Sequence, residues 1–411
     1  MKQKPSMLRT SRSVLFLLAS ALFAFGCLIT FGGLTEPQST SLVTLSSVFS
    51  KGTRGKKYDP PKPVSKPVSY SRNSPGIRLI IFCGTRPEVV KLAPLIRAIK
   101  LSNLDYVVVF TGQHPDIAEP FRKYWEISFD TVITDVFEKG QTLGSLVGNL
   151  ITGIERQVGF SENDVWVLQG DTSTSLAAGM VAFYRGTPFI HLEAGLRTFN
   201  HAAPFPEEAN RRTLSLLASL HIAPTSLSEF RLIEQGVERD RIYMLGNTGI
   251  DAVRLAQPQT VPPFEISAIR TRLVLVTLHR RENAKRFDEL YETIGRLKPQ
   301  NVSYIVPVHP NPASMRATLE ACKKHTHIIC VKPFGYGETQ WMLANSMFVL
   351  TDSGGLQEEA TWYGKPVLVF RENTERPEAI DAGSSLLIPN IATLQNKMSL
   401  LCDSGSGLLH N

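Results

Sequence analysis

Three acidic side chains follow hydrophobic segments in the first half of the 411-residue chain. Asp171 ends the stretch VLQGD, Glu193 ends IHLE, and Glu207 lies in PFPEEANRR. Carboxylates that line a boundary between domains can act as general acids or bases when burial raises their pKa. One such residue alone would be unremarkable, but three of them near one bound group predict proton transfer on that group.

A glycine-rich turn in the second half has the composition of an anion-binding loop. In TDSGGLQEEA, the residues Ser353, Gly354 and Gly355 follow a strand-like run and precede a helical one. Glycines let a ligand approach the backbone N–H groups, and the helix N-terminus behind them favours an anion. The alternative is a plain tight turn with a serine cap. Glu359, one helical turn below, could bond to ribose hydroxyls or be a solvated helix acid.

Three basic side chains are candidates to hold the same anion from both halves. Arg86 lies in CGTRPE, His279 ends LVTLH, and Arg376 lies in FRENTERPEA. A guanidinium group suits a diphosphate because its fork bonds two oxygens. The alternative for Arg86 is a salt bridge to Glu88, and a lone histidine is more often structural. Together the three residues predict a diphosphate held from two sides.

The elements that must position these residues form two similar halves. Strands are predicted at IRLIIF, DYVVVFTGQH, DVWVLQGD and TPFIHLE, and the pattern restarts from RLVLVTLH to KPVLVF. Near-continuous hydrophobic runs of this length are typical of buried parallel strands. We therefore expect an α/β protein with two Rossmann-like, doubly wound domains, residues 77–255 and 256–411, facing each other across a cleft. Because GxGxxG follows neither first strand, a tightly bound dinucleotide is not supported, and no cofactor or metal is predicted.

The N-terminal residues have a different composition. Residues 14–35 carry no charge, and at about 1.5 Å per residue they could cross roughly 30 Å of hydrocarbon. Lysines and arginines precede them, so residues 1–35 predict a cytoplasmic tail and a transmembrane signal anchor, with a cleaved signal peptide as the alternative. Residues 36–76, rich in Ser, Pro and Lys, predict a disordered stem. The folded part would then be lumenal or exterior in a single-pass type II protein, or cytoplasmic if there is no anchor.

Charge and cysteine content argue against two classes of protein. The net charge is +7, but residues 1–78 hold twelve Lys/Arg and two acids, so the remainder carries −3. Without a basic helix in the folded part, no nucleic-acid partner is predicted. The five cysteines show no CxxC pair, so neither a disulfide framework nor a zinc site is expected, and Cys83 reads as a small buried hydrophobe. Asn301-Val302-Ser303 is a glycosylation sequon on a predicted loop.

Taken together, the motifs resemble the non-hydrolysing UDP-N-acetylglucosamine 2-epimerase family over roughly residues 77–390. The matching stretches, in order, are GTRPEVVKLAPL, TGQH, LQGDTSTSLAAG, HLEAGLRT, PEEANRR, GNTGIDA, TLHRREN, VHPNP, DSGGLQEEA and GKPVLVFRENTERPEA. The resemblance implies a GT-B-like fold and the interconversion of UDP-N-acetylglucosamine and UDP-N-acetylmannosamine. In the family's mechanism UDP leaves by anti elimination with loss of the C2 proton, giving 2-acetamidoglucal, and adds back after reprotonation on the other face.

The resemblance also implies a role for each candidate residue. The acid–base residues near the sugar would be Asp171, Glu193 and Glu207. The substrate-binding residues would be Arg86, His279, Ser353, Gly354, Gly355 and Arg376 at the diphosphate, Glu359 at the ribose, Phe334 and Tyr336 near the uracil, and Lys91 as a support on the first helix. A homodimer is the usual assembly in the family.

Some features depart from the family pattern. Thr339 replaces a bulky apolar residue three positions after Tyr336, and PDI follows TGQH where a basic residue and Met are frequent. The closing C-terminal helix that normally returns to the first domain is expected to be missing, and a membrane anchor is unusual. These departures leave three alternatives: a hydrolysing epimerase that releases UDP and N-acetylmannosamine, an inactive UDP-sugar-binding remnant, and a fold-related glycosyltransferase.

Overall fold

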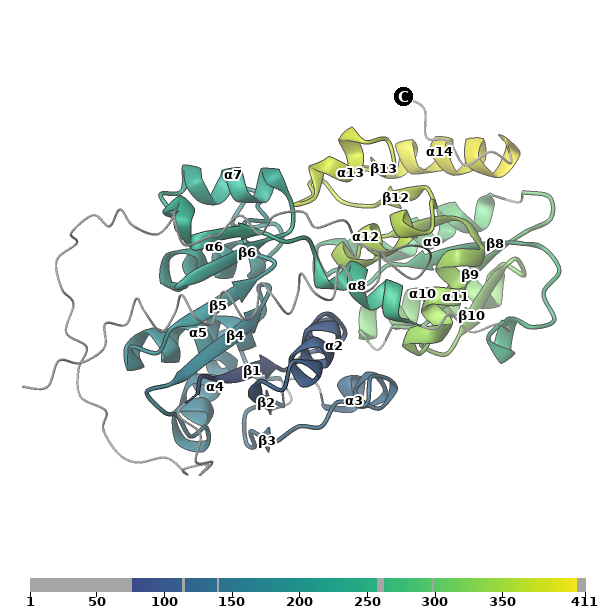
Figure 1. Ribbon diagram of the computed structural model, residues 1–411. Helices are drawn as coiled ribbons and strands as arrows, with labels where there is room; N and C mark the ends of the chain where they lie inside the picture. The colour runs from purple at the N-terminus through teal and green to yellow at the C-terminus, as the bar shows by residue number, and fades with distance from the viewer. Residues whose placement is uncertain are drawn as a thin grey trace, which may run out of the picture.

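The protein consists of two α/β lobes that lie side by side, each built on a parallel sheet with helices against it (Figure 1). The computed structural model describes residues 76–112, 115–138, 140–256, 262–297, 299–309 and 311–404. The predicted anchor and stem therefore lie almost entirely outside the described residues. None of the helices in the described ranges combines the length and apolar character needed to cross a membrane.

The first lobe contains a seven-stranded sheet in the order β3-β2-β1-β4-β5-β6-β7. Its strands are β1 (Arg78–Cys83), β2 (Asp105–Phe110), β3 (Thr131–Val132), β4 (Asp164–Gln169), β5 (Phe189–Leu192), β6 (Leu220–Ala223) and β7 (Ile242–Met244). Its helices are α2 (Arg86–Leu101), α3 (Pro115–Tyr124), α4 (Leu143–Gln157), α5 (Ser173–Arg185), α6 (Glu207–Leu217), α7 (Ser226–Glu234), the 3₁₀ turn η2 (Arg239–Arg241) and α8 (Thr248–Leu255).

The second lobe repeats this plan with a six-stranded sheet in the order β10-β9-β8-β11-β12-β13. Its strands are β8 (Arg272–Thr277), β9 (Val302–Pro307), β10 (Ile328–Val331), β11 (Ser346–Thr351), β12 (Val367–Val369) and β13 (Ser385–Leu387). Its helices are η3 (Phe264–Ile266), η4 (Arg281–Arg286), α9 (Phe287–Arg296), α10 (Pro312–Lys324), α11 (Tyr336–Asn345), α12 (Gly354–Trp362), α13 (Pro377–Asp381) and α14 (Ile391–Ser404).

Both sheets have a point at which the strand order reverses, between β1 and β4 and between β8 and β11. Loops that leave neighbouring strands at such a point run to opposite faces of the sheet, which leaves a ligand-binding crevice at the carboxyl ends. The prediction of two doubly wound parallel-sheet domains is confirmed, and the arrangement is consistent with a GT-B-like fold. The sheets separate between Leu255 and Arg272; the boundary at 255/256 falls in this interval and stays a prediction.

The hydrophobic runs of the sequence form the cores of the two sheets. All six residues of β4, DVWVLQ, are buried, as expected for a central parallel strand covered on both faces. Trp166 is fully buried and its ring lies 4.6 Å from that of Phe82. Apolar clusters lie on both faces of each sheet, so each lobe has a core of its own.

The cysteine prediction was wrong in one respect. Cys322 and Cys330 form a disulfide that joins the last turn of α10 to the strand β10. The two cysteines are eight positions apart in the sequence, so they form no short-spaced pair, and only the return of β10 along α10 brings the sulfurs together. Cys83 is buried, as expected, with 2% of its surface exposed.

Two buried histidines make stability depend on pH. His191 and His221, on β5 and β6, are both 0% exposed, with ring centroids 6.4 Å apart. Burial lowers the pKa of His191 to about 4 and that of His221 to about 3. The unfolded chain, with ordinary histidine pKa values of about 6.5, therefore binds more protons than the folded one as pH falls below 6.5.

We expect these histidines to cost about 2 kcal/mol of stability each between pH 7 and pH 5. Replacing His221 by Leu should remove that share of the pH dependence. Urea unfolding at the two pH values measures it, and His201→Leu, at an exposed position, is the control. The expectation is wrong if His221→Leu and wild type lose equal stability on acidification.

Candidate active site

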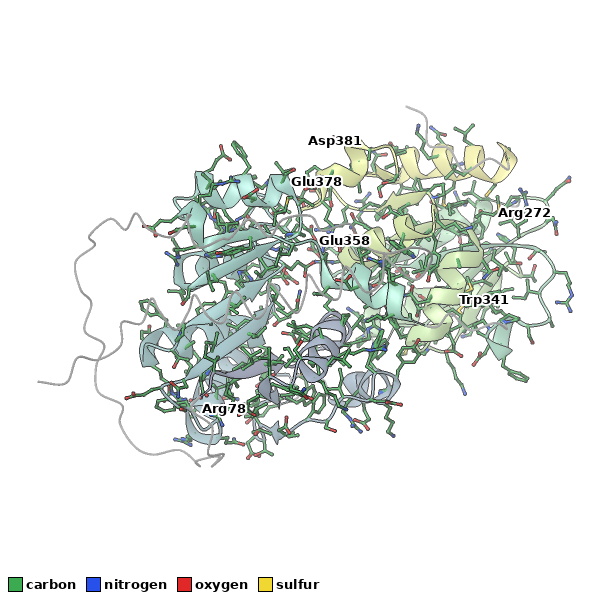
Figure 2. The ribbon with its side chains drawn as sticks, in the orientation of Figure 1. Arg78, Arg272, Trp341, Glu358, Glu378 and Asp381 are labelled. Atoms are coloured by element: carbon green, nitrogen blue, oxygen red, sulfur yellow. A yellow bond between two sulfur atoms is a disulfide. The ribbon has the colours of Figure 1, made fainter. Side chains whose placement is uncertain are left out.

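Some of the predicted functional residues, among them Glu193, Glu207 and Arg376, lie where the lobes join. Glu193 follows β5 in the first lobe and Ser353 follows β11 in the second. The contacts that connect the lobes here include a hydrogen bond from Arg376 Nη2 to Glu193 Oε1 at 2.8 Å and one from Asn247 Nδ2 to Glu358 Oε2 at 2.8 Å. Figure 2 shows Glu358 at this junction.

Glu193 accepts hydrogen bonds from several side chains of both lobes. Its carboxylate accepts hydrogen bonds from Lys91 Nζ at 2.6 and 2.5 Å, from Gln169 Nε2 at 2.7 Å and from Asn247 Nδ2 at 3.1 Å. Its backbone has φ 58°, a left-handed conformation that is strained for a glutamate and is frequent at functional sites. Burial alone would raise its pKa, but the Lys91 and Arg376 charges lower it to about 2. Glu193 is therefore an ionised carboxylate suited to stabilise developing positive charge.

Asp171 and Glu207 form the second part of the acidic group. Asp171 Oδ2 accepts a hydrogen bond from Arg211 Nε at 2.7 Å. Glu207, the first residue of α6, has a buried Oε2 with no hydrogen-bond partner among the described residues, and its Oε1 lies 3.8 Å from Arg280 Nη1 of the other lobe. Burial and then the neighbouring Asp171 raise the pKa of Glu207. A carboxyl group whose pKa is raised in this way is suited to take part in proton transfer.

Arg376 is surrounded by three carboxylates. Its guanidinium contacts Glu193 Oε1 at 2.8 Å, Glu358 Oε1 at 3.0 Å and the carboxylate of Glu375. A Cβ atom on Gly354 would lie 2.8 Å from Arg376 Nη1. The guanidinium therefore lies beside the predicted anion-binding loop, as expected, but in this structure its hydrogen bonds go to carboxylates.

The loop that was predicted to bind an anion lies at the start of α12. Ser353 precedes α12, and its side chain does not cap that helix; its backbone N–H donates to Thr351 Oγ1 at 3.0 Å. The alternative of a serine-capped turn is therefore not supported. The N-terminus of α12, including Gly354 and Gly355, faces the junction between the lobes, where an anion would be favoured.

Gly354→Ala should disturb this loop, because the new methyl group would lie within 3 Å of Arg376 Nη1 and Glu375 Oε1. We expect a loss of about 1–3 kcal/mol in the free energy of unfolding. Gly355→Ala is the matched control: its Cβ would meet only Glu359 Oε1, at 3.6 Å, and alanine favours a helix by up to about 1 kcal/mol. Urea unfolding of both variants tests this expectation, which is wrong if they are equally stable.

Arg86 does not form the alternative salt bridge to Glu88. The Glu88 oxygens accept from the N–H of Thr85 at 2.8 Å and from Thr172 Oγ1 at 2.7 Å, so Glu88 closes the start of α2 as a capping box. The Arg86 guanidinium lies over the ring of Phe121, 5.3 Å from its centroid. Arg86 is thus free of Glu88 and lies near the residues of the other lobe.

His279 is fixed at the end of β8. Its ring stacks on that of His309 with centroids 4.6 Å apart, and its Nδ1 lies 3.4 Å from Asp352 Oδ1. Burial lowers the pKa of His279, while Asp352 opposes that shift. The contacts with Asp352 and His309 hold the imidazole ring at the end of the strand.

The predicted nucleoside end of the site is more closely packed than expected. Glu359 Oε2 accepts from Gln340 Nε2 at 2.6 Å, and burial raises the pKa of Glu359 to about 7. Phe334 lies in the core of the second lobe with 7% of its surface exposed. Tyr336 packs against the first lobe, with its ring 5.4 Å from that of Trp125. The predicted contacts of these residues with ribose and uracil stay predictions.

The structure adds partners that the sequence did not reveal. Each of these partners contacts a predicted residue and helps to orient it. Gln169 and Asn247 contact Glu193, Arg211 contacts Asp171, Asp352 contacts His279, and Glu358 and Glu375 contact Arg376. All of them lie in the conspicuous motifs, such as LQGD, GNTGID and NTERPE. Their pairing required the three-dimensional arrangement.

Comparison with known proteins gives the same assignment. The sequence profile of the family described as UDP-N-acetylglucosamine 2-epimerase matches residues 97–406. The UDP-N-acetylglucosamine 2-epimerase of Salmonella borreze is 36% identical over 329 residues, which are 76% of this chain and 86% of that protein. That of Campylobacter jejuni is 33% identical over 76% of this chain and 85% of its own length.

Solved structures agree. The UDP-GlcNAc 2-epimerase from Neisseria meningitidis bound to UDP-GlcNAc has a TM-score of 0.73 at 30% identity, covering 82% of this chain and 95% of that one. The S. aureus MnaA–UDP co-structure has a TM-score of 0.74 at 32% identity, covering 80% and 88%. The chain belongs to the UDP-N-acetylglucosamine 2-epimerase family.

Proposed function

We propose that this protein interconverts UDP-N-acetylglucosamine and UDP-N-acetylmannosamine without hydrolysis. The observation that carries the proposal is that two acids of the first lobe each meet an arginine of the second lobe at the junction, Glu193 with Arg376 at 2.8 Å and Glu207 with Arg280 at 3.8 Å, while Arg376 lies beside the glycine-rich N-terminus of α12. The comparisons support the substrate, since relatives of similar fold bind UDP or UDP-GlcNAc.

The reaction needs two proton transfers at C2, and UDP must leave C1 and return to it. A base removes the C2 proton as the C1–O bond breaks and its electron pair leaves with UDP, which yields the glycal. The proton then returns to the opposite face of C2 while a UDP oxygen re-forms the bond to C1. The Asp171–Glu207 pair serves these proton transfers, and Glu193 stabilises the positive charge that develops at C1.

The remaining residues bind the leaving group. Arg86, His279, the Ser353 side chain and the N–H groups of Gly354 and Gly355 hold the diphosphate, and Glu359 bonds to the ribose. Phe334 and Tyr336 border the uracil, and Lys91 and Arg376 act at Glu193. The contact of Arg376 with Glu193 and its position beside Gly354 support these assignments.

Incubation with UDP-N-acetylglucosamine in deuterated solvent tests the function. We expect deuterium at C2 and the manno epimer in the recovered nucleotide sugar, both visible by proton NMR. UDP binding without C2 exchange would contradict the proposal, and free UDP accumulating together with N-acetylmannosamine would indicate a hydrolysing enzyme instead.

We also propose that residues 14–35 anchor the protein and that the two lobes lie in a secretory lumen or outside the cell. Two features of the second lobe support this placement. A disulfide such as Cys322–Cys330 persists in oxidising compartments. Asn301 of the sequon is exposed and precedes β9, and its carbonyl accepts from Arg272, which lies far from the junction of the lobes (Figure 2). A glycan there would not obstruct the active site.

The expected result is a glycan on Asn301 of the full-length protein from its own cells. Enzymatic deglycosylation should increase its gel mobility, and Asn301→Gln should abolish the shift. An unmodified Asn301 together with freely alkylated Cys322 and Cys330 would contradict the lumenal placement. The proposed homodimer is tested on the same material by analytical ultracentrifugation.

A further inference from the structure

The buried carboxylate of Asp352 joins the two turns that flank the reversal of strand order in the second lobe. Asp352 is 0% exposed. It accepts the backbone N–H of His279 at 3.0 Å, that of Arg280 at 2.9 Å, and Asn283 Nδ2 at 3.0 Å. Its own position directly precedes the Ser353–Gly355 loop. One side chain thus sets the distance between the turn after β8 and the anion-binding loop after β11.

Asp352 also sets the state of the His279 ring. The ring has Asp352 Oδ1 at 3.4 Å on its Nδ1 side and is stacked on His309. The charged or titratable groups that face it are Asp352, Arg280, Glu282, His309 and, from the other lobe, Arg86. Because a carboxylate near Nδ1 favours the N–H there, Nε2 is left to meet a ligand.

Asp352 also positions Arg280, which lies close to Glu207 of the first lobe. Besides the bond from its N–H, Arg280 donates through Nε to the backbone oxygen of Asp352 at 3.2 Å. Its Nη1 then lies 3.8 Å from Glu207 Oε1 in the first lobe. A shift of Asp352 would therefore move His279 on one side and the partner of Glu207 on the other.

We propose that Asp352 is a positioning residue for the epimerisation reaction: it fixes His279 and Arg280 so that departure and return of the diphosphate occur beside the Asp171–Glu207 pair. It acts through these residues and does not touch the substrate. The inference rests on the proposed function, which it deepens by assigning control of the leaving group to a residue behind the anion-binding loop.

Asp352→Asn is the test, with Asp164→Asn as the matched control. Asp164 is also a buried aspartate whose carboxylate accepts a backbone hydrogen bond. It pairs with Arg78 at 2.8 Å and accepts a hydrogen bond from the N–H of Ser161. It lies at the opposite end of its sheet, at the start of β4. Both variants should lose stability, so stability does not distinguish them. Two other measurements distinguish the variants: the affinity for UDP, measured by calorimetry over a pH series, and kcat/KM.

We expect Asp352→Asn to lower kcat/KM and UDP affinity by about 10- to 100-fold, as is usual when the partner orienting a functional histidine is removed. The loss of UDP affinity on raising pH should also occur at lower pH, since His279 loses the charge that favours its protonated form. Asp164→Asn should leave UDP affinity and its pH dependence at wild-type values.

The inference is overturned if Asp352→Asn binds UDP with wild-type affinity and pH dependence, or behaves as Asp164→Asn does. The proposed function fails separately, if the wild-type protein binds UDP but neither exchanges the C2 proton nor forms the epimer. In that case the effect of Asp352→Asn on UDP binding still decides whether Asp352 positions His279. A wild-type protein without UDP affinity would overturn both.

Discussion

Glu207→Gln should reduce the rate of C2 proton exchange by roughly 10²- to 10⁴-fold, the usual contribution of a general acid–base residue. The amide has the shape of the protonated carboxyl group but cannot transfer its proton in the same way. The free energy of unfolding should stay the same or rise. Burial and Asp171 raise the pKa of Glu207, so its ionised form destabilises the folded state above the unfolded pKa, and a neutral side chain removes that cost.

The neighbouring Glu208 supplies the matched control. Glu208 is 0% exposed, and its oxygens accept from the N–H groups of Thr198 at 3.0 Å and Phe199 at 3.2 Å. Glu208→Gln should cost about 1–3 kcal/mol of stability, because an amide nitrogen would face one of these donors. Urea unfolding and the deuterium exchange assay, run on both variants, separate the two effects. A Glu207→Gln variant that exchanges at the wild-type rate would remove Glu207 from the mechanism.

Local patterns were sufficient to predict the elements that carry the site. The all-buried strand β4 and the turn from β11 into α12 each depend on a short sequence: a hydrophobic run in one case, and glycines before a helix in the other. Since parallel strands align their carboxyl ends, the acids and glycines that follow them had to lie near one edge of each sheet. The fold and the position of the candidate site follow from these two facts.

The sequence did not predict which side chains contact one another in the site. Arg376 was expected to contact a diphosphate. In the structure it contacts three carboxylates: Glu193 after β5, Glu358 on α12 and the adjacent Glu375. Tyr336 was expected near uracil, and it packs across the junction against Trp125. Glu193 and Trp125 lie on the opposite lobe, more than a hundred residues from their partners, so these two pairings depend on how the lobes meet. The Cys322–Cys330 disulfide depends in the same way on the path of β10.

At the junction of the lobes, three carboxylates surround the guanidinium of Arg376. Glu193, Glu358 and Glu375 would repel one another if the cation between them were absent, and Glu375 and Glu193 are almost completely buried. Arg376 offsets part of this negative charge. Burial acts to lower the pKa of Arg376, but Glu358, Glu375 and Glu193 raise it above its ordinary value. A charge in this position affects both the stability of the protein and the ionisation of Glu193.

Arg376→Met should therefore cost about 3–5 kcal/mol of stability, the range for removing one partner of a buried ion pair. Arg316→Met is the control: Arg316 and its partner Asp288 are both 62% exposed, and an exposed pair contributes at most about 1 kcal/mol. Equal losses in urea unfolding at pH 7 would show that Arg376 does not hold the junction together. The double variant Arg376→Met with Glu193→Gln should regain part of the loss, because one unpaired carboxylate is removed.

The pH dependence gives the sharper test. In the wild type the pKa of Glu193 is lowered to about 2, so its contribution to stability is complete above the unfolded value near 4.5 and is lost as pH falls from there towards 2. Without Arg376 a main cause of the lowered pKa is gone and burial acts to raise it. Acidification from pH 7 to pH 5 should then narrow the difference in stability between Arg376→Met and wild type. A gap that stays constant over this range would mean that Glu193 keeps its low pKa through Lys91 alone, and that Arg376 acts elsewhere.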